Sequence, residues 1–272
     1  MAQALVAYPA PNELPKEQWS ADALSGNEPS DDVARPDIEW VPSFKTYKAR
    51  VEALAALGLD RPTTLPAGWP EEVTTSRVWS KSDFTSESQY VVEFSKAEIA
   101  EIEAGLAHFK GLPGELGPDD VSQKTYPLPT LATKLDEISV SIHNGIGFAI
   151  LRGLEPKKYS KLDNVLIYLG ITSYIAETRG CQDYDGRMLV HIQDIQEELR
   201  KYGKRGPFSP YHSRTQPFHT DRCDILALYA MDVAPMGGES FLASSAKIYN
   251  EIAKERPDVI HTLIKDDWVF DE

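Results

Sequence analysis

The stretch Arg214–Asn250 reads RTQPFHTDRCDILALYAMDVAPMGGESFLASSAKIYN and predicts two extended runs joined by a tight turn. The first run, residues 225–231, is apolar enough to form a buried strand. A Pro-Met-Gly-Gly turn follows, and the second run, residues 239–243, leads into a helix start. This strand–turn–strand unit is the feature around which the rest of the chain is organised.

Two potential metal ligands, His219 and Asp221, precede the first run. Residues i and i+2 of an extended segment point to the same face, so the imidazole and the carboxylate are expected to project together. They would make two thirds of the facial triad that holds non-haem Fe(II). With 6 His and 42 acidic residues in 272, about one such pair arises by chance, and a surface strand with two polar residues is the alternative. The following strand, the Gly-Gly turn and Ser240 favour a site.

The motifs FHTD, GGES and SSAKIYNEI, together with GFAILRGL at Gly147–Leu154, resemble the TauD/TfdA family of Fe(II)- and 2-oxoglutarate-dependent dioxygenases. The similarity is greatest to its fungal and clavaminate-synthase-like members and covers roughly Gly147–Glu272. The resemblance implies that His219 and Asp221 bind iron and that Ser240 helps to hold 2-oxoglutarate. It implies Fe(II) as cofactor, with 2-oxoglutarate and O2 as cosubstrates.

One part of the family pattern is missing from the 272 residues. The resemblance implies a third ligand, a second His much further along the chain, followed by an Arg that pairs with the cosubstrate. The only later histidine, His261, falls in a predicted short helix without a following Arg, where a packing or surface role is expected. The C-terminal part of the dioxygenase is therefore expected to be absent from this chain or supplied by another.

The strand predicted at Met188–Asp194 provides two further candidates. Its alternation places His191 and Gln193 on one face, opposite an apolar face. If this strand borders the mouth of a barrel, both side chains are candidate substrate or cosubstrate contacts. A solvated outer face is the alternative, and the sequence leaves the two open.

Composition limits the classes of partner. The formal charge is −14 and the sequence pI is near 4.9, so nucleic acid and anionic membrane surfaces are poor partners. Two cysteines give no disulfide framework, and neither a signal peptide nor a membrane span is apparent, so a cytoplasmic location is expected. A small organic molecule is the expected substrate, and the oligomeric state, including a homo-oligomer, is left open.

The remaining chain predicts helices around short strands. Residues 1–88 read as an N-terminal extension that wraps the core, with a helix ending at Gly58. Residues 89–272 read as an incomplete jelly-roll domain. Its predicted elements are a strand at 89–94, a helix opened by the capping box Ser95–Glu98, a helix over 131–142 with a left-handed cap at Asn144-Gly145, a strand at 148–152 and a helix carrying Leu162, Val165, Leu166 and Leu169.

These patterns predict an α+β protein whose core is a double-stranded β-helix, or jelly roll, with flanking helices. The implied activity is oxidation of a small organic substrate, by hydroxylation or desaturation, with release of succinate and CO2. The alternative is a non-catalytic or truncated jelly-roll protein that acts as a binding or interaction module.

Overall fold

The computed structural model describes residues 44–57, 61–181, 186–193, 216, 218–221, 223–266 and 268. The chain divides into two units, Met1–Thr63 and Thr64–Glu272, which are described separately. The first contains helix α1, Phe44–Ala56, with an ion pair between Lys48 and Glu52 at 3.9 Å. The helix predicted to end at Gly58 is therefore present, and Gly58 itself lies outside the described residues.

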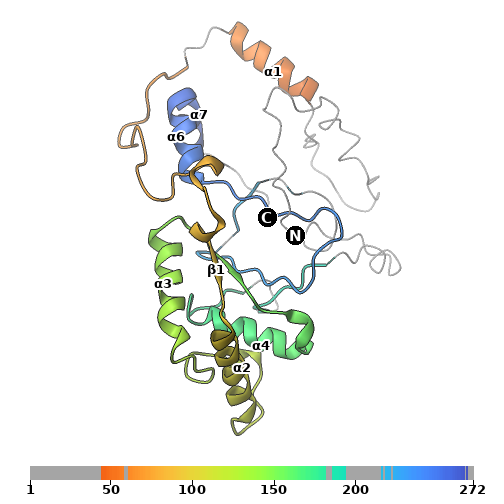
Figure 1. Ribbon diagram of the computed structural model, residues 1–272. Coiled ribbons are helices and arrows are strands. Elements are labelled where there is room, and N and C mark those ends of the chain that lie inside the picture. Colours follow the sequence, from red (N-terminus) through yellow and green to blue (C-terminus); the bar gives the residue numbers. More distant parts are fainter. Residues whose placement is uncertain are drawn as a thin grey trace, which may run out of the picture. The chain divides into compact units, whose positions relative to one another are not determined.

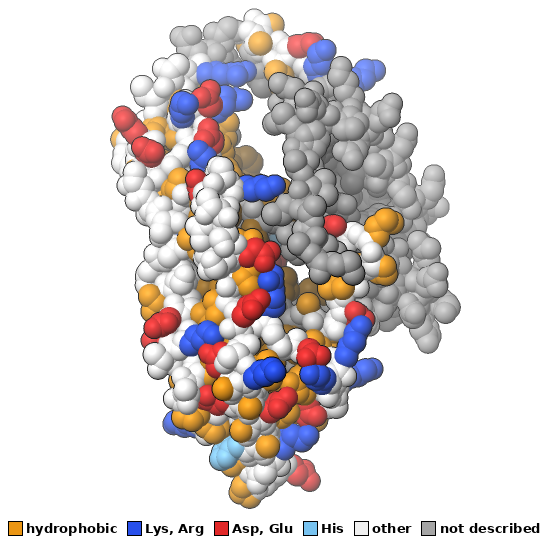
Figure 2. Space-filling view, viewed as in Figure 1, with side chains coloured by type: hydrophobic (Ala, Val, Ile, Leu, Met, Phe, Trp, Pro, Cys, Tyr) orange, Lys and Arg blue, Asp and Glu red, His pale blue; other side chains and the backbone are white. Residues whose placement is uncertain are grey.

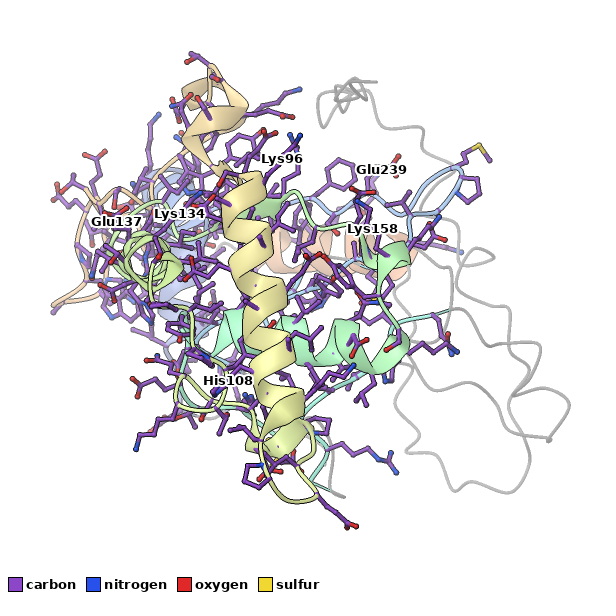
Figure 3. The ribbon with its side chains drawn as sticks, turned by 60° about the horizontal axis from the view of Figure 1, so that its bottom comes forward. Lys96, His108, Lys134, Glu137, Lys158 and Glu239 are labelled. Carbon is purple, nitrogen blue, oxygen red and sulfur yellow. The ribbon has the colours of Figure 1, made fainter. Side chains whose placement is uncertain are left out.

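The second unit has a core of three helices, α2 (Lys96–Gly111), α3 (Leu131–Asn144) and α4 (Lys161–Thr172). Figure 3 shows α2 from Lys96 near one end to His108 near the other, with α4 crossing it. The apolar spacing predicted in the sequence is the buried face of α2 and α3, and it matches that of α4 except at Leu162, which is exposed. The core residues are Ile102, Leu106 and Phe109 from α2, Leu131, Leu135 and Ile138 from α3, and Leu166, Ile167, Leu169 and Ile171 from α4.

Tyr126 lies at the centre of this core. Its side chain is fully buried, and its hydroxyl donates a 2.7 Å hydrogen bond to the Ile102 carbonyl. Burial is the main reason that the pKa of this phenol lies above its ordinary value. A Cβ added at Gly105 would lie 2.6 Å from the Tyr126 ring, and one added at Gly170 would lie 2.7 Å from it. The two glycines therefore allow α2 and α4 to close on the ring.

Two short strands, β1 (Val91–Glu93) and β2 (Ile150–Arg152), pair in parallel, with Val92 opposite Leu151. The crossover between them contains α2 and α3, as a parallel connection requires (Figure 1). Within the described ranges this is the one sheet. The described residues of the second unit are thus a mixture of helices and few strands, and no antiparallel strand pairing is placed among them.

Residues 73–79 tie the C-terminal end of α3 to helix α6, Ser245–Glu255. The Asn250 side chain on α6 accepts from the Val73 amide at 2.8 Å and donates to the Val73 carbonyl at 2.9 Å. On the other side, the Trp79 indole donates to the Ile146 carbonyl just after α3 at 2.8 Å. These residues pack as part of the second unit. The Asn250 side chain satisfies both backbone groups of Val73, as a neighbouring strand would.

Helix α7, Pro257–Leu263, follows α6 directly and begins with proline, as the first turn of a helix allows. Basic and acidic side chains are interspersed on the face of the molecule shown in Figure 2. In the described part of the chain, no helix has the length and apolar character needed to cross a membrane.

Candidate functional site

The site predicted from the sequence lies on residues 218–221, in a segment without regular secondary structure. The Nε2 atom of His219 is 3.9 Å from Oδ1 of Asp221. Both side chains are about half exposed, at 52% and 47%. The two groups therefore face one another across a gap open to solvent, the arrangement that their i, i+2 spacing predicts.

The donor chemistry and spacing of this pair fit one divalent metal ion. Bonds from a first-row metal to imidazole nitrogen and carboxylate oxygen are about 2.0–2.2 Å, so two such donors are about 3 Å apart at a right angle and about 4.2 Å apart at most. The separation of 3.9 Å lies inside this range. A right angle at the metal would require the Nε2 and Oδ1 atoms to approach to about 3 Å. Across the described ranges, no group of three His, Cys, Asp or Glu side chains is placed to hold a metal.

The apolar run that follows the pair is anchored to α4 by two tyrosines. Tyr229 donates to Oδ1 of Asn164 at 2.8 Å, and Tyr168 donates to the Ala227 carbonyl at 3.0 Å. Asn164 is itself 1% exposed, and its amide nitrogen donates to carbonyls at the start of α4, including that of Pro156 at 2.9 Å. Burial raises the pKa of Tyr168 and of Tyr229, so both phenols stay protonated donors.

These anchors were not predicted from the sequence. Asn164 occurs inside an otherwise apolar helix face, and Tyr229 inside an apolar run. A polar group at a buried position requires a hydrogen-bond partner, so each residue was a signal that a partner exists. Neither signal identifies the partner, because residues 164 and 229 are far apart in the chain.

The predicted strand at 225–231 is wrong for the described structure. Residues 225–231 form no strand, and Leu226 and Leu228 are 54% and 63% exposed. Residues 239–243 likewise form no strand. A strand requires a neighbour that pairs with its backbone N–H and C=O groups, and no such neighbour is placed beside either run in the described ranges.

Ser240, the predicted cosubstrate contact, lies between the glycine turn and α6. Gly237 and Gly238 have φ of 76° and 80°, which only glycine adopts readily, so the predicted turn is present. Ser240 is exposed and makes no hydrogen bond to another described residue. Ala243 lies two residues before the start of α6. Ser244 caps this helix, because its hydroxyl accepts a hydrogen bond from the Lys247 amide at 2.9 Å.

His191 and Gln193 do not share a strand face, because residues 188–193 form no strand and the prediction there is wrong; Asp194 lies outside the described residues. Both side chains are exposed. His191 lines a pocket of about 300 Å³ beside α4, and Gln193 is not part of its lining. The structure therefore separates two residues that the sequence had grouped.

His261 lies on α7, as predicted, and its Nε2 atom is 3.0 Å from the Thr64 carbonyl oxygen. This contact joins α7 to the start of the second unit. The contact agrees with the packing or surface role expected for His261.

Comparison with known proteins agrees with the motifs. Residues 108–272 match the family described as "Taurine catabolism dioxygenase TauD, TfdA family". The taurine hydroxylase-like protein SAT17 of Stachybotrys chartarum is 42% identical over 196 residues, covering 71% of this chain and 50% of the relative. The FR-33289 synthase of Streptomyces rubellomurinus is 27% identical over 197 residues, covering 69% of this chain and 54% of the relative. The chain thus spans about half the length of these curated relatives, and it belongs to the TauD/TfdA dioxygenase family.

Proposed function

We propose that this chain is part of an Fe(II)- and 2-oxoglutarate-dependent dioxygenase in which His219 and Asp221 are iron ligands. The observation that carries the proposal is the 3.9 Å approach of imidazole to carboxylate, within the residues that match the family. The solvent-accessible gap between the two groups supports it, because a metal and two cosubstrates need open coordination positions.

The proposed site assigns a task to each residue. His219 binds through a neutral ring nitrogen and Asp221 through an ionised oxygen, so acid opposes metal binding by protonating both. Ser240 donates its hydroxyl to 2-oxoglutarate, and a further histidine completes the triad. Iron held by these residues would supply the oxidative chemistry of the family, in which O2 and 2-oxoglutarate are consumed, succinate and CO2 are released, and the substrate is oxidised.

The whole protein is proposed to fold as a double-stranded β-helix, the fold that the TauD/TfdA family implies. The exposed apolar side chains of residues 226–242, such as Leu226 and Leu228, support this, because a large exposed apolar patch is normally covered in a folded protein. Residues 1–88 would be an extension of this domain, which begins at residue 89.

We propose a small organic substrate and hydroxylation as the outcome. The word hydroxylase in the name of the relative from Stachybotrys chartarum supports the reaction type. The formal charge of −14 argues against nucleic acid as a partner. Cys181 and Cys223 are both free thiols, which agrees with a cytoplasmic location.

The proposal is tested by anaerobic titration of the 272-residue chain with Fe(II), with and without 2-oxoglutarate. The variant His219→Ala removes one proposed ligand. His108→Ala is the matched control, because His108 is an exposed residue of α2. Binding that strengthens with 2-oxoglutarate, is lost in His219→Ala and persists in His108→Ala is the expected result.

Weak binding that is indifferent to 2-oxoglutarate and equal in the two variants would overturn the assignment for this chain. The family fold would then serve as a non-catalytic binding or interaction module. A third result, Fe(II) binding that requires His219 but ignores 2-oxoglutarate, would keep the metal site and remove Ser240 from the cosubstrate contacts.

A further inference from the structure

A pocket of about 300 Å³ lies beside the C-terminal half of α4, against the short helix Pro118–Asp120. Its charged lining consists of Arg179, Arg187 and Asp119, with His191 as a fourth polar group. Two guanidinium groups against one carboxylate leave the lining net positive, in a chain whose formal charge is −14. Neither His219 nor Asp221 lines it.

The rest of the wall is apolar. Pro118, Leu169, Met188 and Leu189 complete the lining. Leu169 is 3% exposed and belongs to the core, so this side of the pocket is a fixed surface of α4. Leu189 packs against the same core. An apolar wall of this kind favours the binding of a short hydrocarbon chain or ring, because binding removes apolar surface from water.

Backbone carbonyls position the Arg179 guanidinium before any ligand arrives. Arg179 donates to the Pro118 carbonyl at 3.4 Å and to the Val121 carbonyl. These two hydrogen bonds use two of the five N–H donors of the guanidinium and leave three for a ligand. Arg187 is likewise engaged by the protein. A positioned guanidinium loses little side-chain entropy when it binds an oxyanion.

We propose that this pocket binds a small organic acid, with its oxyanion head on Arg179 and Arg187 and its short apolar body on Leu169, Met188 and Leu189. The volume lies at the lower end of the range for ligand pockets, which limits the ligand to a few carbon atoms beyond its head. Asp119 disfavours a second acidic group on the ligand by repulsion. This site is additional to the proposed iron site and does not depend on it.

The test is isothermal titration of the full metal-free chain with hexanoate, with 1-hexanol as the neutral probe. Hexanoate should bind in a one-to-one ratio, and 1-hexanol at least about tenfold more weakly, as loss of a charge-assisted hydrogen bond predicts. Affinity should rise from acetate to hexanoate by about threefold per methylene group that is fully buried. Pentane-1-sulfonate distinguishes a requirement for a carboxylate from binding of any oxyanion.

Arg187→Gln should weaken hexanoate binding at least about tenfold. Arg152→Gln is the control, because Arg152 is a surface residue that pairs with Glu87 at 3.0 Å and does not line the pocket. Arg179→Gln also removes two hydrogen bonds to backbone carbonyls, so the thermal unfolding of this variant is measured together with its affinity for hexanoate. Equal binding of hexanoate and 1-hexanol, or equal losses in Arg187→Gln and Arg152→Gln, would overturn the inference.

Two further measurements separate this pocket from the iron site. Hexanoate binding should be unchanged in His219→Ala and in saturating 2-oxoglutarate. Displacement of hexanoate by 2-oxoglutarate would overturn the inference, because the pocket would then belong to the cosubstrate. Failure of the Fe(II) titration, by contrast, leaves the hexanoate result standing.

Discussion

The segment at 218–243 is richer in apolar residues than the helical core at 91–175, yet its apolar side chains are far less buried. Leu135 and Ile167 of the core are 0% exposed, whereas Leu228, Val233 and Met236 of the segment are 63%, 77% and 93% exposed. An apolar side chain stabilises a protein only where other atoms cover it. The comparison therefore teaches that the helical core buries its apolar side chains against one another, whereas the described apolar side chains of the segment carrying His219 and Asp221 are largely open to solvent.

The difference follows from how each kind of element satisfies its backbone. A helix pairs its own N–H and C=O groups, so α2, α3 and α4 form wherever an apolar face can be buried. An extended run needs a neighbour for the same groups. Side chains hold the segment 223–243 to α4 through Tyr168 and Tyr229, and to Lys157 just before α4 through its 3.2 Å ion pair with Asp232.

The largest expected effect comes from the same substitution made in both regions. Leu135→Ala should lower the free energy of unfolding by about 2–5 kcal/mol, because it leaves a cavity in a closed core. Leu228→Ala should change it by less than about 0.5 kcal/mol, because that side chain is 63% exposed. Urea unfolding of both variants checks this. A loss at Leu228 as large as that at Leu135 would show that the segment is covered in solution.

The next largest effect tests the packing of α2 and α4 around Tyr126. Gly170→Ala should destabilise by about 1–3 kcal/mol, despite the better helix propensity of alanine, because its Cβ would lie 2.7 Å from the ring. Gly111→Ala is the control, since a Cβ at Gly111 meets nothing within 4 Å. In a Tyr126→Leu background the cost of Gly170→Ala should shrink, as measured by a double-mutant cycle of unfolding free energies. An unchanged cost would contradict the ring contact.

Local patterns predicted the elements of the core and the proximity of His219 to Asp221. The capping box at Ser95–Glu98, the apolar faces of α2 and α3 and the i, i+2 spacing of His219 and Asp221 each concern neighbours in the chain. In α4 the same approach placed Leu162 on the buried face, and it is 55% exposed, because α4 buries Ile167 and Ile171 instead.

Contacts between distant residues were not predictable in this way. The left-handed cap expected at Gly145 is wrong: Gly145 has φ −101°, and the left-handed residue is Gly147 at φ 90°. The Gly145 amide bonds back to the Ser141 carbonyl at 2.8 Å and α3 ends at Asn144, so the Asn-Gly pattern predicts the end of the helix correctly and misplaces only the left-handed residue, by two positions. The pocket lined by His191 and the Tyr229–Asn164 bond likewise arise from tertiary packing.

A smaller effect compares serines from the two regions. Ser95→Ala should lower the free energy of unfolding by about 1 kcal/mol, because Ser95 accepts from the Glu98 amide at the start of α2. Ser240→Ala should leave stability within about 0.5 kcal/mol, since Ser240 makes no hydrogen bond to another described residue. Thermal unfolding without cosubstrate checks both. If Ser240→Ala weakens 2-oxoglutarate binding and leaves stability unchanged, the result supports the proposed contact between Ser240 and 2-oxoglutarate.

The smallest expected effect is a difference in acid sensitivity between two ion pairs. The Lys110 ammonium is 2.8 Å from Asp163 at the start of α4, and this bond is the main reason that the pKa of Asp163 lies below its ordinary value of 3.8. The pair in the exposed segment is Lys157 with Asp232, where the Val233 amide is the main cause of the lowered pKa and the carboxylate is 70% exposed.

A carboxyl group whose pKa is lower in the folded state stabilises that state above its unfolded pKa, and the contribution disappears as the pH falls through the folded pKa. Lys110→Met should therefore cost about 0.5 kcal/mol near neutral pH and less as the pH falls below about 3.8, with Asp163 only 18% exposed. Lys157→Met should have no measurable effect at either pH, because its pair is open to solvent. Urea unfolding as a function of pH distinguishes the two. An effect of Lys157→Met equal to that of Lys110→Met would mean that the segment after His219 is held as firmly as the core, and the contrast between the regions would fail.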